Sequence, residues 1–191
     1  MIMIDLETLA VTEDAHILEI GWCEFTEKEI SAQGCYLLCM PQGRHIDYET
    51  VKWHIKREYN FFQSNCLSLE VALQDLYLRI KRADYLWSKG HFDYPILAHA
   101  LKQFHMPVPW EYWQVMDCRT LFNFHGVKID VAHNAQCDAV AQAEGVIRCR
   151  TLCARSAVST ASSTVARAAD TSSPETGKVP PSAEGTRAKL A

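Results

Sequence analysis

The sequence lacks a long apolar run, a signal peptide and the glycine-rich motifs of two large enzyme classes. No stretch approaches the roughly 18 consecutive apolar residues of a transmembrane helix, so we expect no membrane span. The first residues, MIMIDLET, have no basic group and place acids at positions 5 and 7, unlike a secretory signal. Neither a Walker-type phosphate loop nor a Gly-x-Ser-x-Gly elbow occurs. These absences predict a cytoplasmic protein that uses neither motif.

A basic charge balance is also missing. Lys and Arg number 19 against 23 Asp and Glu, which gives a formal net charge of -4. A scaffold that binds many nucleic-acid phosphates normally has a basic surface, so the composition disfavours that class. The charge is compatible with an enzyme whose acidic pocket holds metal ions, because such ions become the largest local charges.

The cysteine spacing does not indicate a zinc site. The chain has 8 Cys; Cys35 and Cys39 are four positions apart, as are Cys149 and Cys153. Zinc knuckles use a two-residue gap instead. Without an export signal we expect reduced thiols, and we interpret them as buried and unreactive.

The composition changes near residue 150. Residues 151–191 are mostly Ala, Ser and Thr, with no aromatic residue and with Pro174, Pro180 and Pro181. Such a segment cannot bury enough apolar surface to offset its conformational entropy, so we predict a disordered tail. The sequence leaves open whether this tail is an appendage or the result of a changed reading frame. The functional domain is therefore predicted within residues 1–150.

Strand-forming runs alternate with amphipathic segments in that domain. Three strands followed by helices that alternate with two more strands predict an α/β domain, with an antiparallel meander first. The expected strands are Ile2–Asp5, His16–Phe25, Gln33–Cys39, Tyr85–Trp87 and Gln114–Asp117, and the expected helices are Ser68–Arg82, Tyr94–Phe104 and Asn134–Ile147.

Acidic residues occur at the ends of these elements. Asp5 and Glu7 lie two positions apart, and strand side chains repeat every two residues, so both carboxylates point to one face. Asp93 follows the fourth strand at the start of a helix. The alternatives are a solvated strand end for the pair, and for Asp93 a surface carboxylate that complements the helix dipole.

A histidine and another acid occur in HNAQCDA. With a helix starting at Asn134, Asp138 is just over one turn in, and the flanking Ala residues favour close packing that turns it inward. His133 precedes the helix, where a neutral imidazole could act as a general base. A surface Asp and an ordinary helix-start His are the alternative. Four carboxylates and one His from separate elements are the set that two-metal hydrolysis requires.

With these residues assembled, the chain resembles the DnaQ-like, DEDDh-type 3′–5′ exonucleases of the ribonuclease H-like fold. The similarity lies in three segments, IMIDLET, GHFDYPIL and HNAQCDA, and spans residues 1 to about 148. It implies a five-stranded mixed sheet flanked by helices, and release of nucleoside monophosphates from the 3′ ends of single-stranded DNA or RNA. It also implies two Mg²⁺ or Mn²⁺ ions, His133 as the general base, and a metal-binding set of Asp5, Glu7, Asp93 and Asp138.

A finer resemblance is to the phage and bacterial exonuclease branch that is related to exoribonucleases. The segment TVKWHIK is similar to its Thr-x-x-Trp motif, which makes Trp53 a candidate for stacking on a terminal base, with burial in the core as the alternative. Thr8, His91 and Arg119 are further substrate-binding candidates, although an ion-pairing role in the fold is favoured for Arg119.

Two other functions remain open at this point. One is a catalytically silent module that binds 3′ ends or a replication partner, and the other is a damaged prophage remnant. The presence of all five catalytic positions disfavours a silent module, since such a module has no chemical reason to keep them. The oligomeric state, a homodimer included, and the preference between DNA and RNA are not determined by the sequence.

Overall fold

The structure is a computed structural model that describes residues 1–61 and 63–169. By its internal contacts the chain divides into the units Met1–Cys153 and Ala154–Ala191. The first unit contains a five-stranded sheet of order β3-β2-β1-β4-β5. Its strands are β1 (Ile2–Thr8), β2 (Ile17–Phe25), β3 (Ile30–Leu37), β4 (Leu86–Ser88) and β5 (Val115–Asp117). The first three strands pair antiparallel, and β1–β4 and β4–β5 pair parallel, which confirms the mixed sheet.

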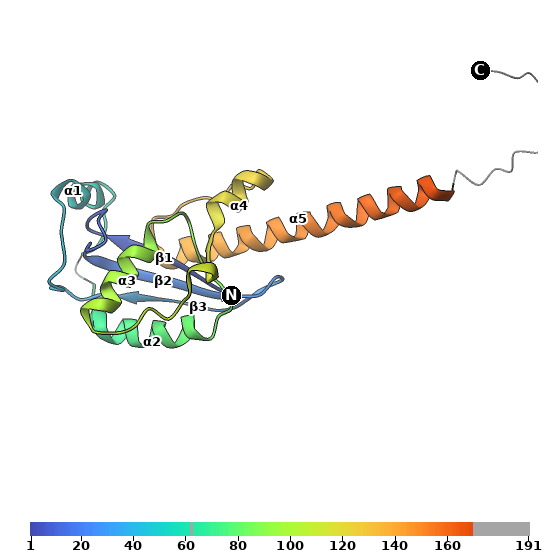
Figure 1. Ribbon diagram of the computed structural model, residues 1–191. Helices are drawn as coiled ribbons and strands as arrows, with labels where there is room; N and C mark the ends of the chain where they lie inside the picture. The colour runs from blue at the N-terminus through green and yellow to red at the C-terminus, as the bar shows by residue number, and fades with distance from the viewer. Residues whose placement is uncertain (62, 170–191) are drawn as a thin grey trace, which may run out of the picture. The chain divides into compact units, whose positions relative to one another are not determined.

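Helices flank this sheet (Figure 1). They are α1 (Tyr48–Lys56), α2 (Leu69–Lys81), α3 (Asp93–Gln103), a 3-10 turn at Tyr112–Gln114, α4 (Cys118–His125) and α5 (Ala135–Ala169). The three expected helices are present, and Ser68 caps α2 by accepting from the Val71 amide. The helices α1 and α4 were not predicted. Each begins after an Asp, Asp47 or Asp117, whose carboxylate accepts an amide hydrogen bond in the first turn.

The core has two parts because β1 is buried on both faces. Ile2, Ile4 and Leu6 belong to one cluster, which includes buried side chains of α2 and α3. Met3 belongs to the other cluster, together with Ala139 and other buried residues of α5. Side chains alternate along a strand, so Asp5 and Glu7 point to the same face as Met3. The fold therefore directs this acidic pair toward the face that α5 covers.

The helix α5 extends beyond the predicted domain end. Residues 151–169 are helical where the sequence argument expected disorder. The segment contains no Gly or Pro and is rich in Ala, the strongest helix former, so local propensity outweighs the shortage of apolar surface. Residues 170–191, the rest of the expected tail, lie outside the described residues, and the functional division at residue 150 stays a prediction. Within the described part of the chain, no helix is both long and apolar enough to cross a membrane.

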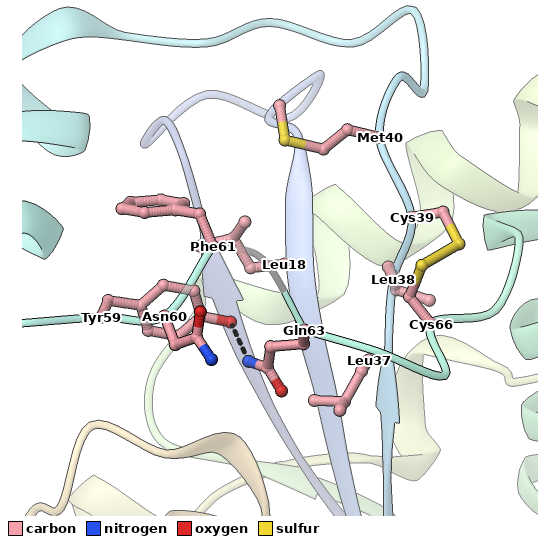
Figure 2. A pocket seen from close by; sticks show the side chains of 10 residues that line it. All are labelled: Leu18, Leu37, Leu38, Cys39, Met40, Tyr59, Asn60, Phe61, Gln63 and Cys66. Carbon is pink, nitrogen blue, oxygen red and sulfur yellow. Dashed lines mark hydrogen bonds between the residues drawn. A yellow bond between two sulfur atoms is a disulfide. The ribbon is translucent and has the colours of Figure 1, made fainter.

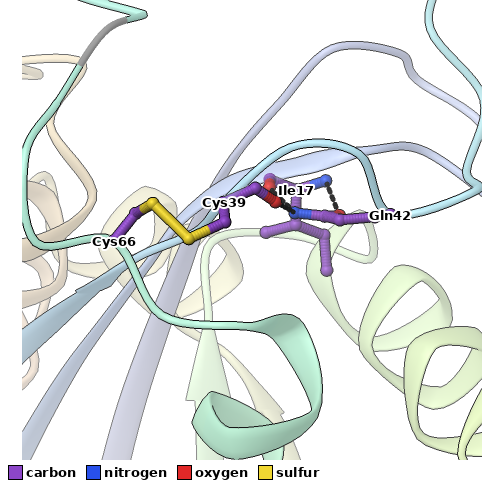
Figure 3. The surroundings of a disulfide bond; sticks show 4 residues. All are labelled: Ile17, Cys39, Gln42 and Cys66. Atoms are coloured by element: carbon purple, nitrogen blue, oxygen red, sulfur yellow. Dashed lines mark hydrogen bonds between the residues drawn. A yellow bond between two sulfur atoms is a disulfide. The ribbon is translucent and has the colours of Figure 1, made fainter.

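The expectation of reduced thiols is wrong for one pair. Cys39 and Cys66 form a disulfide with a Cα–Cα separation of 5.1 Å (Figure 3). Backbone hydrogen bonds of Leu67 with Leu37 and Cys39 bring the two segments together next to β3. Because the cysteines are 27 positions apart in sequence, local spacing carries no signal of their proximity. Beside the disulfide, the side-chain amide of Gln42 accepts a hydrogen bond from the backbone amide of Ile17 and donates one to its carbonyl oxygen. These two bonds connect this loop to the start of β2.

Candidate active site

The β1 carboxylates lie at the interface with α5. The Gln142 Nε2 amide donates a 2.7 Å hydrogen bond to Oδ1 of Asp5. Glu7 is 8% exposed and lies directly opposite Glu19 in the β1–β2 register. The alternative interpretation, a solvated strand end, is therefore wrong. The half-buried carboxylate of Asp5 and the buried carboxylate of Glu7 both face α5.

Asp93 is directed at the same strand from α3. Its side chain is 5% exposed, and Oδ1 accepts a 3.2 Å hydrogen bond from the backbone amide of Leu6. The alternative of a surface carboxylate that only complements the helix dipole is therefore wrong. Because Leu6 lies between Asp5 and Glu7, this bond fixes Asp93 beside the acidic pair.

Asp138 lies in the first turn of α5 and organises the loop before it. It is 4% exposed, so the surface alternative is wrong here as well. Its two carboxylate oxygens accept from the backbone amides of Ala132 and His133, the latter at 2.9 Å. Asn134 caps the helix by accepting from Cys137, as its position in the sequence suggested. These bonds hold the His133 backbone in a left-handed conformation with φ 55°.

Three of the five predicted residues converge in one group. Glu7, His133 and Asp138 each offer a ligand atom within 4.8 Å of the others, and this is the metal-compatible group found among residues 1–61 and 63–169. Asp5 and Asp93 lie outside that group, bonded instead to Gln142 and to the Leu6 amide. The carboxylate oxygens of Glu7 and Asp138 suit a hard divalent cation such as Mg²⁺ or Mn²⁺, which leaves the imidazole of His133 free for another role.

Burial makes the carboxylates of Asp5, Glu7 and Asp93 costly to ionise without a cation. Desolvation, followed by the charge of Asp93, raises the pKa of Asp5 well above its ordinary value. Desolvation and the nearby charge of Glu19 raise the pKa of Glu7 to about 7, and desolvation raises the pKa of Asp93 to about 7. A bound cation would reverse these shifts by favouring the carboxylates. The donor set and its burial thus fit a divalent metal.

The imidazole of His133 has the opposite tendency. Desolvation and the positive charge of Arg57 lower its pKa, so the neutral form prevails at neutral pH. Arg57 was not anticipated from the sequence. Its guanidinium lies 4.5 Å from the centroid of the Trp53 ring, and both residues line a pocket of about 280 Å³ together with His133.

A second, more apolar pocket of about 450 Å³ opens beside Glu7. Trp53 lines it and is 39% exposed, which rules out the core alternative for this side chain. Phe92, immediately before Asp93, lines the same pocket and was missed. His54 anchors this wall, because its Nε2 donates a 2.9 Å hydrogen bond to the carbonyl oxygen of Thr8.

The remaining predicted residues have different surroundings. Thr8 lines the Trp53 pocket, although its hydroxyl donates to the Ala10 carbonyl. Arg119 donates to the Lys89 carbonyl at 3.4 Å, which supports a role in holding the loop before α3. His91 is exposed in that loop and does not belong to the Glu7 group.

Comparison with known proteins identifies related domains. A family model described as the 3′-5′ exoribonuclease Rv2179c-like domain matches residues 1–149. A search of curated proteins found no match.

Solved structures of exonuclease I are similar in fold. One, described as suggesting how processivity is achieved, aligns with a TM-score of 0.59 and 10% identity, and covers 79% of this chain and 42% of the other. A product-bound structure aligns with a TM-score of 0.56 and 9% identity, and covers 78% and 41%. This chain thus spans about two fifths of the length of those proteins. The similarity confirms the ribonuclease H-like fold.

Proposed function

We infer the reaction from one premise: this chain belongs to the family of the 3′-5′ exoribonuclease Rv2179c-like domain, whose model matches residues 1–149. It is accordingly a 3′–5′ exonuclease, a hydrolase of phosphodiester bonds. We propose that it removes nucleoside 5′-monophosphates from the 3′ ends of single-stranded nucleic acid by metal-dependent hydrolysis. The convergence of Glu7, His133 and Asp138 within 4.8 Å is the observation that supports this mechanism most directly.

The metal-binding residues in this proposal are the half-buried Asp5 and the three buried acids Glu7, Asp93 and Asp138. Glu7 and Asp138 would hold one cation, and Asp5 would turn one oxygen toward it while Gln142 orients the other. Asp93, bonded to the Leu6 amide, would complete the set from α3. When bound, Mg²⁺ or Mn²⁺ supplies positive charge that activates water and stabilises the phosphate oxygens.

His133 would act as the general base. Its lowered pKa leaves a ring nitrogen free to accept the proton of the attacking water at neutral pH. Asp138 positions it through the 2.9 Å bond to the His133 amide, so one residue would serve both the metal and the base.

The pocket beside Glu7 would hold the terminal nucleotide. Trp53 and Phe92 offer aromatic surfaces on which any base can stack, which suits an enzyme that degrades strands of varied sequence. Thr8 and Glu7 line the same pocket, so a sugar bound there would lie next to the carboxylates. The family description favours RNA as the first substrate to test.

The experiment uses the full chain with 5′-labelled single-stranded RNA, and with DNA of the same sequence, in Mn²⁺ or EDTA. We expect a ladder that shortens from the 3′ end, requires Mn²⁺, and falls at least about a hundredfold in Asp93→Asn and His133→Ala. Asp84→Asn is the matched control, because Asp84 is exposed and lies outside the acidic group.

Three results would contradict the proposal. Cleavage that persists in EDTA would remove the role of the metal. Full activity of Asp93→Asn would place the chemistry elsewhere. Shortening from the 5′ end would refute the polarity of the reaction.

A further inference from the structure

Another buried acid, which was not among the site residues predicted from the sequence, lies beside the candidate site. Glu19 is the third residue of β2, directly opposite Glu7 in the strand register, and is only 2% exposed. A carboxylate buried to this extent requires compensating hydrogen bonds, because losing its hydration is costly. The surroundings of Glu19 therefore indicate what it does.

Both oxygens of Glu19 accept hydrogen bonds from the protein. Oε1 accepts from the Tyr59 hydroxyl at 2.8 Å and from the Gln63 amide at 3.4 Å. Oε2 accepts from the backbone amide of Ala135 at 3.2 Å, and the Cys35 thiol approaches it at 3.9 Å. Protein donors thus engage both oxygens of Glu19, and Glu19 lies outside the group of potential metal ligands found in the described residues.

The Tyr59 side of this network belongs to the connection between α1 and α2. Figure 2 shows the hydrogen bond between Tyr59 and Gln63, which measures 3.3 Å, and the Cys39–Cys66 disulfide near the end of the same connection. The Tyr59 ring also contacts the rings of His54 and Phe61. The two donors to Oε1 are thus held by a covalently closed loop and by ring packing.

The Ala135 side belongs to the start of α5. Ala135 is the first residue of the helix, and its amide is one of those left without a partner inside the helix. An anion at this end is also favoured by the helix dipole. Gly21, two residues after Glu19, packs directly against the backbone of Ala135. A Cβ atom at Gly21 would lie 1.9 Å from the Ala135 carbonyl oxygen, so β2 and the start of α5 are in backbone contact.

The bond to Ala135 lies, in sequence, between His133 in the loop before α5 and Asp138 in the first turn of α5. His133 precedes Ala135 by two residues, and Asp138 follows it by three. We propose that Glu19 is a positioning residue for hydrolysis, which docks the start of α5 so that His133 and Asp138 face Glu7. This inference rests on the proposed function and assigns Glu19 no contact with the substrate.

Two substitutions at this position separate hydrogen bonding from charge. Glu19→Gln and Glu19→Met both remove the charge, but only the Gln side chain still accepts from Ala135. We expect Glu19→Gln to keep kcat within about threefold of the wild type, and Glu19→Met to lose about tenfold or more, with KM nearly constant, because small displacements of catalytic groups are costly. Leu76→Ala, in the core and away from the site, is the control for general destabilisation and should keep its kcat.

Two further measurements complete the test: the affinity for Mn²⁺, and the kcat of the milder variant Tyr59→Phe. Calorimetry with Mn²⁺ alone should show binding at least about fivefold weaker in Glu19→Met than in Glu19→Gln, because misplacing Asp138 disturbs the metal-binding group. Tyr59→Phe keeps the ring packing and should lower kcat by about threefold even if Glu19→Met fails to fold. Equal kcat and equal Mn²⁺ affinity in the two Glu19 variants, or an unchanged kcat in Tyr59→Phe, would overturn the inference. If the wild type has no metal-dependent activity, the proposed function fails, and the Mn²⁺ affinities still decide the role of Glu19.

Discussion

Gln142 in α5 donates a 2.7 Å hydrogen bond to Asp5 in the central strand, 137 residues away in sequence. Gln142 is 1% exposed, so this bond forms in a buried interface where an unpaired carboxylate oxygen is costly. The bond engages Oδ1 of Asp5, so Oδ2 is the oxygen that the proposed metal site would use.

Replacing Gln142 with Leu should impair catalysis. Leu has a similar volume but cannot donate, so the Asp5 carboxylate loses its orientation and its pKa rises further, since the Gln142 hydrogen bond lowers it. We expect kcat in Mn²⁺ to fall by about tenfold, on the scale of losing a residue that orients a metal ligand. Steady-state kinetics with labelled RNA would measure this. An unchanged kcat would show that the orientation of Asp5 does not matter.

The metal-free protein should lose stability as the pH rises. Glu7 and Asp93 have folded pKa values of about 7, above their ordinary values of 4.5 and 3.8, so the folded state binds more protons than the unfolded state. This contribution is complete below about pH 4 and is lost as the pH rises through 7. In EDTA we expect Tm to be about 5 °C lower at pH 8 than at pH 5.

Mn²⁺ should reverse this dependence. In the proposed site the cation would bind the ionised carboxylates, so it should raise Tm more at pH 8 than at pH 5. Glu7→Gln, which removes one titrating group, should flatten the metal-free profile. A Tm in EDTA that is equal at both pH values, measured by thermal unfolding, would contradict the electrostatic account of the site.

Trp53 should contribute mainly to substrate binding. It lines the pocket beside Glu7 but lies outside the group of potential metal ligands. Base stacking on an aromatic side chain is worth about 1 to 3 kcal/mol, so Trp53→Ala should raise KM by about tenfold and change kcat less. Trp113→Ala is the control, since Trp113 is 58% exposed and lies outside that pocket. A loss confined to kcat would instead mean that Trp53 acts through His133, whose ring centroid lies 5.0 Å from its own.

The features of the site that depend on local periodicity were predicted correctly from the sequence. Asp5 and Glu7 share a face because they are two positions apart in a strand, and Asp138 turns inward because Ala139 and Ala143 allow α5 to pack closely. The helix α1 was not predicted because it is short, with nine residues, and buries only His54, so the sequence offers few core positions from which to recognise it.

Residues that act through distant partners were not predictable in this way. Glu19 lies in the run ILEIGW and has the pattern of an ordinary strand position. Its role depends on Tyr59, Gln63 and Ala135, which are 40, 44 and 116 positions away. Only the register that places Glu19 opposite Glu7 could have drawn attention to it, and a single sequence does not determine that register.

The Cys39–Cys66 disulfide should stabilise the fold by restricting the unfolded chain. For the 27-residue separation, the loop-entropy relation gives a stabilisation of about 3 to 4 kcal/mol, which reduction or Cys66→Ser should remove. Urea unfolding with and without dithiothreitol measures it, and Cys137→Ser is the matched control because Cys137 is exposed and free. The connection between α1 and α2 also holds Tyr59 and Gln63 against Glu19, so kcat should fall together with stability in Cys66→Ser. A loss of stability with full kcat would mean that the hydrogen bonds of Tyr59 and the packing of its ring hold this connection without the disulfide.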